Sequence, residues 1–374
     1  MVDPSLFTAP YDAALSDGLQ TNGTRPTWAT RALRANEEDL LAMTSCLPFF
    51  YPFTDGPRRR TGAAWRAVKG LEHVAGLRRL QKEAARFDLV HFQWAPLPML
   101  DVRAVRRIRR DRPVVLTVHD VEPFNGRPVS AAQSGGYHAM LGEFDRLIVH
   151  TEQGRDALRT RGLPADRIHV IPHGVLPLRA AAPEPRADDG RWRIVLFGRL
   201  QAYKGVDLLV EALGLIDPAV RARIEVIVAG EAQMPVEPIL ARAADLKLGA
   251  SFTLRAGRLS EDAMAALLRS ADAFVFPYRA IDASGVLHLV ADLHRWLIAS
   301  DIGAFRTMIG KSDDTGDLVP PADTQALADA IVRSIGRRPQ APPDTGVSDW
   351  TQIGAMTRDV YDAALADRGR SAAS

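Results

Sequence analysis

Short apolar runs rich in β-branched residues recur along the chain, and each is followed by a turn signal and then by an apolar pattern of helical period. The hydrophobic positions within these runs are continuous rather than alternating, which is typical of parallel strands covered on both faces. The pattern therefore predicts an α/β protein with doubly wound parallel sheets. The predicted strands lie in FDLVHFQW, PVVLTVHD, DRLIVHT, IHVIPHG, RWRIVLFGR, IEVIVAGE, DAFVFPY and RWLIASD.

One stretch without apolar periodicity separates two such series, and it reads LPLRAAAPEPRADDG. We interpret this stretch as a linker, because Pro, Ala and charged residues dominate it. The chain of 374 residues is then expected to form two Rossmann-like domains, 1–175 and 176–349, followed by a helix within 350–374. The crevice between the two domains is the default ligand site. The opening MVDPSLF predicts an unusually short first strand, with YDAALSDGL as the following helix.

The composition is that of a folded protein, with 47% hydrophobic and 25% charged residues. Cys46 is the single cysteine, so no disulfide can form within the chain, which suits a reducing compartment. The start lacks the pattern of a signal peptide, and the longest charge-free candidate for a membrane span is interrupted by prolines. We therefore expect a cytoplasmic protein.

The positive charge is concentrated in the first half of the chain. Residues 1–172 hold 24 Lys and Arg against 19 Asp and Glu, a net charge of +5, whereas the remainder holds 23 against 26, a net of −3. Much of the excess lies in WRAVKGLEHVAGLRRLQKEAARF and RAVRRIRRDR. Solvated helix faces would explain it, and so would attraction to an anionic membrane surface. No aromatic interleaving or recognised module accompanies it, so no nucleic-acid partner is expected.

The stretch LFGRLQAYKGVDLLVEAL places two cations in the turn between a predicted strand and helix. Gly198 allows the backbone to approach a ligand, and the helix that begins near Gly205 directs its positive dipole end to the same place. Arg199 can donate forked hydrogen bonds to phosphate oxygens, and Lys204 supplies a point charge. Two surface cations on an ordinary loop are the alternative.

A second anion-binding turn is predicted about 80 residues later, in FVFPYRAIDASGVLHLVADL. Asp282 or Ser284 could cap the helix that opens there, and the main-chain amides of Gly285, Val286 and Leu287 would face a bound anion. Two such helix starts in one domain could clamp a diphosphate.

These elements, in this order and spacing, resemble the nucleotide-binding domain of GT-B glycosyltransferases, closest to the GT4-type family that builds bacterial glycans. The resemblance rests on LFGRLQAYKGVDLLVEAL, VIVAGE and LRAGRLSEDAMAALLRSADAFVFPYRAIDASGVLHLVADLHRWLIASDIGAF. It extends to IPHGV before the linker, to the final helix DWTQIGAMTRDVYDAAL and, more loosely, to VVLTVHD. The implied fold is GT-B, with an acceptor domain, a nucleotide-sugar domain and a last helix that crosses back to the first domain.

The resemblance also implies roles for individual residues. Arg199 and Lys204 match the pair that holds the donor diphosphate, His119 matches a first-domain histidine that contacts the transferring sugar, and Asp282 stands near that sugar. As a lone residue at a strand end, His119 could equally be a packing residue. The implied donor-binding residues are Gly198, Glu231, Arg258, Leu259, Ser284, Gly285, Val286 and Leu287.

The chain departs from the family where Glu-x7-Glu is common in the donor helix. The two positions hold Asp282 and Val290, and a valine side chain cannot accept a hydrogen bond from ribose. In this departure the chain resembles β-mannosyltransferases that use GDP-mannose. The donor base, UDP or GDP, the sugar and the stereochemical course therefore stay open.

The expected reaction transfers a sugar from a nucleotide-diphosphate sugar to a glycan or lipid-linked glycan. No Asp-x-Asp occurs in the sequence, so no metal cofactor is expected, and the paired cations would neutralise the leaving diphosphate. We favour a retaining course; an inverting enzyme would need a base, for which Asp17, Asp120 and His119 are candidates. The stretches SCLPFFYPF and FNGRPVSAAQSGGYHAM are expected to be acceptor-side loops. A non-catalytic nucleotide-sugar scaffold and a sugar-nucleotide epimerase remain alternatives.

Overall fold

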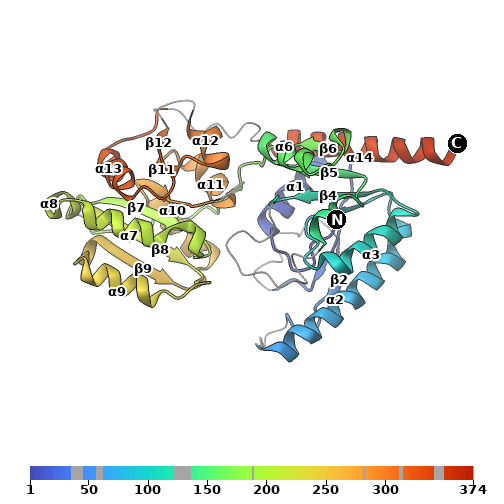
Figure 1. Ribbon diagram of the computed structural model, residues 1–374, viewed down its shortest axis with the longest axis horizontal. Coiled ribbons are helices and arrows are strands. Elements are labelled where there is room, and N and C mark those ends of the chain that lie inside the picture. Colours follow the sequence, from blue (N-terminus) through green and yellow to red (C-terminus); the bar gives the residue numbers. More distant parts are fainter. Residues whose placement is uncertain are drawn as a thin grey trace. The chain divides into compact units, whose positions relative to one another are not determined.

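The computed structural model describes residues 1–34, 45–55, 62–121, 136–187, 189–280, 284–310, 315–340 and 349–373. Along the chain these residues divide into two compact units, between Gly174 and Val175. The first unit holds the residues up to Gly174 together with the C-terminal helix, and the second holds those from Val175 to residue 340 (Figure 1).

The strands of the first unit are all parallel. Strands β3 to β6 are hydrogen-bonded in sequence order, and β1 pairs with β2. Val2 pairs with Ala29 of β1 and with Phe92 of β3, so it connects the pair to the larger sheet. The short first strand predicted from MVDPSLF is therefore a single bridging residue. The strands are β1 (Thr27–Arg31), β2 (Ser45–Phe50), β3 (Val90–Phe92), β4 (Val114–Val118), β5 (Arg146–Val149) and β6 (Ile168–Val170).

The prediction of a loop for SCLPFFYPF is wrong, because Ser45–Phe50 forms β2 and pairs with β1. Pro48 within this run argued against a strand, since proline cannot donate to a sheet ladder. The strand lies at the end of the strand order, next to β1 alone, and an edge strand tolerates proline.

Helix α2 (Ala63–Glu83) is continuous through both of its glycines, although each lowers helix propensity. Gly76 has a packing role, because a Cβ atom there would lie 2.3 Å from Cδ1 of Phe50. The helices of the first unit are α1 (Ala9–Thr21), α2, η2 (Ala84–Arg86), α3 (Pro98–Arg109), α5 (Tyr137–Leu141), α6 (Glu152–Thr160), η3 (Ala165–Arg167) and α14 (Trp350–Ala373).

Helix α14 follows the second unit in sequence but packs on α1 of the first. The two backbones approach closely at Gly18 and Gly354, where a Cβ on either glycine would lie within about 2.2 Å of the other helix's backbone. The Asn22 side chain also donates a 2.7 Å hydrogen bond to the Thr351 carbonyl. Glycine at these two positions therefore allows the helices to come into contact.

The second unit contains a six-stranded parallel sheet in the order β12-β11-β10-β7-β8-β9. Its strands are buried on both faces: on β7, Ile194 and Leu196 pack in one hydrophobic cluster and Val195 packs in another. The strands are β7 (Trp192–Phe197), β8 (Ile224–Gly230), β9 (Phe252–Ala256), β10 (Ala273–Phe276), β11 (Trp296–Ser300) and β12 (Gly316–Val319). The helices are η4 (Ala202–Lys204), α7 (Val206–Leu215), α8 (Pro218–Arg221), α9 (Glu237–Asp245), η5 (Gly249–Ser251), α10 (Glu261–Ser270), α11 (Gly285–Val290), η6 (Ala291–Leu293), α12 (Gly303–Ile309) and α13 (Thr324–Ser334).

We predict that Gly18→Ala destabilises the first unit by about 1–3 kcal/mol, because the added methyl group would overlap the Trp350 carbonyl oxygen. Gly70→Ala is the matched control: no atom lies within 4 Å of its Cβ position, and alanine should stabilise α2 by up to about 1 kcal/mol. Chemical denaturation followed by tryptophan fluorescence measures both. Equal stabilities of Gly18→Ala and the wild type would contradict the close packing of α1 on α14.

Candidate functional site

The strand order of the second unit reverses between β7 and β10, which are neighbours in the sheet but distant in sequence. Chain segments that leave such a strand pair run in opposite directions, so a crevice opens at the carboxyl ends of the strands. Gly198 directly follows β7, and Pro277 and Tyr278 directly follow β10. The predicted phosphate-binding stretches therefore begin at the place in the sheet where α/β folds bind ligands.

Lys204 is buried in this place, with only 5% of its surface exposed. Its Nζ lies 3.4 Å from the Phe197 carbonyl oxygen, to which it donates, and 5.3 Å from the centre of the Tyr278 ring. Burial, followed by the positive charge of Arg199, lowers the pKa of Lys204 to about 7. A nearby anion would therefore stabilise the charged form of Lys204 and raise its pKa.

Gly198 lies where three segments converge. A Cβ at this position would be 2.6 Å from Nζ of Lys204 and 3.1 Å from Cγ2 of Val286, the second residue of α11. Behind it, a Cβ on Gly230 would be 2.0 Å from the Gly198 carbonyl oxygen. The loop after β7, the buried ammonium and the start of α11 are thus brought together.

Ser284 caps α11, because its Oγ accepts a 3.3 Å hydrogen bond from the Leu287 amide. The Leu287 amide, predicted to face a phosphate, is therefore already engaged. Among the described residues, no atom lies within 4 Å of the Cβ position of Gly285. An anion approaching the first turn of α11 would meet the amides of Gly285 and Val286, which have no partner within a helix.

The remaining predicted donor residues lie along the same edge of the sheet. Glu231 follows β8 and is exposed, and its carbonyl oxygen accepts a 2.9 Å hydrogen bond from the Leu200 amide. Arg258 is exposed beyond β9, and Leu259 is half-buried against the core.

Three further positions complete the predicted donor set. Arg199 is exposed, directly after Gly198. Asp282 lies outside the described residues. Val290, which replaces the second family carboxylate, is buried in the hydrophobic core with 1% exposure, so a polar contact to ribose is absent at this position.

In the first unit, His119 directly follows β4 and is enclosed by polar and aromatic groups. Its ring stacks on Trp94 with centroids 5.2 Å apart, and the Tyr11 ring meets it edge-on at 5.0 Å. The Gln93 side-chain amide lies 3.0 Å from Nε2 of His119, and Nε2 of His150 lies 3.2 Å from its Nδ1. Both ring nitrogens of His119 therefore have protein partners.

The two acceptor-side carboxylate candidates differ in position. Asp17 is exposed on α1, and Asp120 is half-buried next to His119, with its carbonyl oxygen accepting a hydrogen bond from the Tyr137 hydroxyl. His173, which precedes the boundary between the two units by one residue, lies 5.3 Å from His150 and 5.0 Å from Tyr11 between ring centroids, in a packed aromatic cluster.

Sequence reasoning missed Gln93, Trp94 and His150 as site residues. Gln93 and Trp94 follow β3, which ends at Phe92, and His150 follows β5, which ends at Val149, as His119 follows β4. The carboxyl ends of parallel strands gather at one edge, and this rule could have identified them.

A pair of buried carboxyl groups lies behind Trp94, whose Nε1 donates to Oγ1 of Thr8. Asp3 accepts hydrogen bonds from the amides of Ser5, Phe7 and Thr8. Burial, followed by the charge and hydrogen bond of Asp3, raises the pKa of Asp12 well above its ordinary value. Burial also raises the pKa of Asp3, but its backbone donors oppose that shift, so we assign the proton that the pair favours to Asp12.

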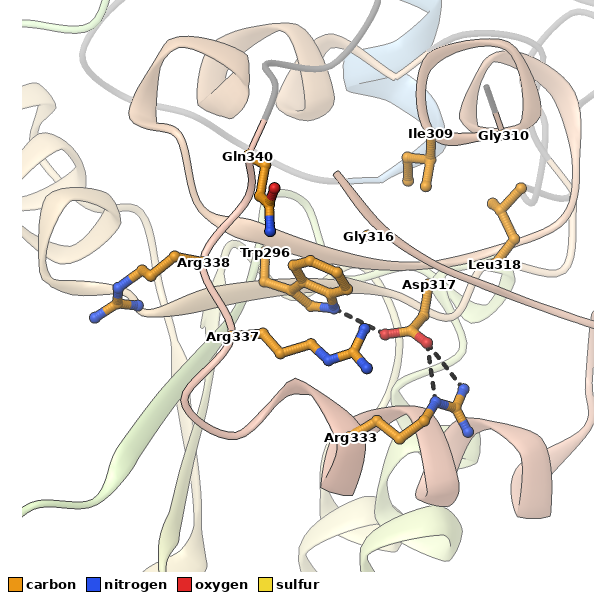
Figure 2. A pocket seen from close by; sticks show the side chains of 10 residues that line it. All are labelled: Trp296, Ile309, Gly310, Gly316, Asp317, Leu318, Arg333, Arg337, Arg338 and Gln340. Atoms are coloured by element: carbon orange, nitrogen blue, oxygen red, sulfur yellow. Dashed lines mark hydrogen bonds and ion pairs between the residues drawn. The ribbon is translucent and has the colours of Figure 1, made fainter. Parts of the chain in front are cut away.

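A cavity of about 810 Å³ lies at the amino ends of the strands of the second sheet, opposite the candidate donor site (Figure 2). It is lined at the beginnings of β11 and β12 by Trp296 and Asp317, and Asp317 is hydrogen-bonded to Trp296 and paired with Arg333. Because these are the amino ends of the strands, this cavity is separate from the candidate donor site.

Among the described residues, no group of three or more His, Cys, Asp or Glu side chains is placed to hold a metal ion. Within the same ranges, no helix combines the length and the apolar character that a membrane span needs.

Comparison with known proteins places each unit in a glycosyltransferase family. The model for Glycosyltransferase Family 4 matches residues 13–177, and that for Glycosyl transferases group 1 matches residues 191–336. The O-antigen chain mannosyltransferase C of Escherichia coli is 25% identical over 267 residues, covering 69% of this chain and 68% of that protein. The phosphatidyl-myo-inositol mannosyltransferase of Mycobacterium leprae is 26% identical over 254 residues, covering 66% and 63%.

Solved structures share the fold. Anabaena HepE in complex with UDP and glucose aligns with a TM-score of 0.65 at 16% identity, covering 100% of this chain and 98% of that one. The sucrose-phosphate synthase of Thermosynechococcus elongatus aligns with a TM-score of 0.65 at 20% identity, covering 96% and 91%.

The two parallel-sheet units and the matched families define a glycosyltransferase with the GT-B fold. The chain belongs to the GT4-type glycosyltransferases, which confirms the fold and the enzyme class predicted from its sequence.

We predict that Asp12→Asn removes a pH-dependent loss of stability. Because the folded state holds a proton on Asp12 that the unfolded state releases above the ordinary pKa of aspartate, wild-type stability falls as pH rises from that value to the raised pKa. The expected slope is about 1.4 kcal/mol per pH unit, and the variant should lack it. Urea midpoints of both proteins from pH 4 to 8 measure the difference.

Asp3→Asn is the control, since it weakens the acceptor of three backbone amides and should destabilise the protein throughout this range. If Asp12→Asn lowers stability as much as Asp3→Asn does, the two carboxyl groups do not share a proton.

Proposed function

We propose that this protein transfers a hexosyl group from a nucleotide-diphosphate sugar to a glycan or lipid-linked glycan in bacterial polysaccharide synthesis. The observation that carries the proposal is the convergence of Gly198, Lys204 and the start of α11 at the switch point of the second sheet. The names of the relatives agree with it, since two are mannosyltransferases and a structural neighbour was solved with UDP and glucose.

In the proposed reaction, the bond between the anomeric carbon and the diphosphate oxygen breaks while the carbon bonds to an acceptor hydroxyl oxygen. Negative charge grows on the leaving diphosphate, and Lys204, Arg199 and the first amides of α11 are the groups proposed to stabilise it. In the retaining course the acceptor proton passes to the leaving phosphate oxygen, so no separate base is required. Because these donors neutralise the diphosphate, the proposed reaction needs no metal ion.

The donor base stays open in this proposal between UDP and GDP. An inverting GDP-mannose transferase on the same fold is the second candidate, favoured by the buried Val290 and by the mannosyltransferase relatives. The anomeric coupling constant of the product, measured by NMR, distinguishes retention from inversion.

A lipid-linked acceptor at an anionic membrane surface is supported by the exposed side of α2. Leu71 is 72% exposed there, in a helix that also carries the exposed cations Arg66, Arg78 and Arg79. Apolar side chains among cations are typical of helices that lie on anionic membranes.

Lys204→Met is expected to lower kcat/KM by about 10- to 100-fold, because one charge-assisted hydrogen bond to phosphate contributes roughly 1.5–3 kcal/mol. Lys82→Met, at an exposed lysine of α2, is the matched control and should keep full activity with soluble substrates. Release of nucleoside diphosphate from a panel of UDP- and GDP-sugars measures both. Wild-type affinity for the donor in Lys204→Met would overturn the proposed site.

Donor binding should also take up a proton. The pKa of Lys204 is about 7 in the free protein, and a bound diphosphate favours its charged form and raises that pKa. Affinity should therefore fall as pH rises above 7, by up to about tenfold per unit. Calorimetry with a nucleotide sugar at pH 8, in two buffers of different ionisation enthalpy, measures the uptake, which Lys204→Met should abolish.

Gly285→Ala should weaken donor binding without affecting the fold. Its added methyl group faces open space in the free protein, but it would lie against an anion bound at the first amides of α11. Unchanged thermal stability with at least tenfold weaker donor binding is expected, as about 1.4 kcal/mol corresponds to tenfold. Equal donor affinity of variant and wild type would place the diphosphate elsewhere.

A further inference from the structure

A directional hydrogen-bond chain in the first unit ends at a main-chain carbonyl. Nδ1 of His150 lies 3.0 Å from the carbonyl oxygen of Ile171. A carbonyl oxygen only accepts hydrogen bonds, so Nδ1 of His150 carries a proton. Burial lowers the pKa of His150 to about 4, and the ring is therefore neutral near pH 7, with a lone pair on Nε2.

The protonation of His150 determines that of His119. Since Nε2 of His150 can only accept, Nδ1 of His119 must donate across the 3.2 Å between them. Burial, followed by His150 and His91, lowers the pKa of His119 well below its ordinary value, so this ring is neutral as well. A neutral ring with its proton on Nδ1 presents Nε2 as an acceptor.

The Gln93 amide completes the assignment. Oε1 is the atom placed 3.0 Å from Nε2 of His119, but two acceptors cannot bond, and a half-turn of the amide exchanges its oxygen and nitrogen in place. Gln93 then donates to His119, and its oxygen faces Nε2 of His91, 3.4 Å away. Gln93 is buried with 1% exposure, so its amide has few other partners available.

The hydrogen bonds of His91, at the other end of the hydrogen-bond chain, support this orientation of the Gln93 amide. Nε2 of His91 lies 2.8 Å from Oγ1 of Thr117, and Nδ1 lies 2.7 Å from the hydroxyl of Tyr361 on α14. The Tyr361 hydroxyl also lies 3.5 Å from Sδ of Met1, but a thioether sulfur is a weak acceptor and the contact to Nδ1 is shorter, so we assign the hydroxyl proton to His91. The proton of His91 is then on Nε2, which donates to Thr117 and faces the Gln93 oxygen. Each of these buried groups then has a complementary partner, and no ring needs a second proton.

The His119 ring is also held in place by its neighbours. Trp94 stacks on it at an interplanar angle of 12°, and Tyr11 from α1 meets it at 87°. The Tyr11 ring also contacts the rings of His150, His173 and Trp350.

We propose that Gln93 and His150 are positioning residues that fix His119 as the tautomer with its proton on Nδ1, so that Nε2 accepts a hydrogen bond from a sugar hydroxyl. A substrate hydroxyl that donates to Nε2 would replace the Gln93 amide there. His119 then recognises a hydroxyl donor and contributes no positive charge to the leaving group. This inference rests on the proposed function, together with the contact between His119 and the transferring sugar that the family resemblance implies.

The test is ¹⁵N NMR of the ligand-free protein labelled at histidine. His119 is expected to remain neutral with its proton on Nδ1 from pH 6 to 8. His150→Phe keeps an aromatic ring but removes the acceptor, so the Nε2-protonated form of His119 should appear. Gln93→Glu replaces the donor by an acceptor of the same shape, so Nε2 should become protonated. His138→Phe, at an exposed histidine, is the control and should leave the His119 signals unchanged.

Activity provides a second readout. His150→Phe and Gln93→Glu should each lower kcat/KM on the order of tenfold, with the Gln93→Glu loss depending on pH as His119 titrates. A wild-type His119 with its proton on Nε2, or variants with an unchanged His119 tautomer, would overturn the inference even if sugar transfer is found. The expected tautomer in a protein that transfers no sugar would instead overturn the proposed function alone.

Discussion

The candidate donor site of the second unit is built around one buried cation. Lys204 has its ammonium group against the ends of β7 and β10, in contact with the Phe197 carbonyl and near the Tyr278 ring. Burying a charge without a full counter-charge is costly, and the lowered pKa of Lys204 is the expression of that cost. The glycines at 198 and 230 leave the space in which the ammonium and the backbone fit together.

In the second unit the sequence predicted β7, β8, β10 and β11, because each is a continuous apolar run. It did not predict β9, which is mostly exposed or half-buried, or β12, which is four residues long and contains Asp317. The first unit was harder. β2 contains Pro48, and only Phe50 of its residues is buried, so it lacks the continuous apolar pattern of a central strand. The first strand is reduced to Val2, and pairing between distant segments cannot be read from so short a run.

The candidate site was predictable to different extents in the two units. Arg199, Lys204 and Ser284 stand in turns with a local signature of glycines and helix starts, which a sequence displays directly. Gln93, His150 and Tyr361 come from β3, β5 and α14, and only the three-dimensional fold brings them to His91 and His119. The engaged amide of Leu287 likewise depended on which residue capped α11, since Asp282 and Ser284 were both possible caps.

The position of α14 has a consequence for how the protein is made. Tyr361, which starts the hydrogen-bond chain through His91, belongs to a helix that the ribosome synthesises after the whole second unit. The first unit therefore cannot reach its final packing while the chain is still growing, although most of its strands emerge early. Before α14 is synthesised, α1 lacks the helix that packs on it and the His91 ring lacks the Tyr361 hydroxyl. The final folding step of the first unit therefore follows the synthesis of the second.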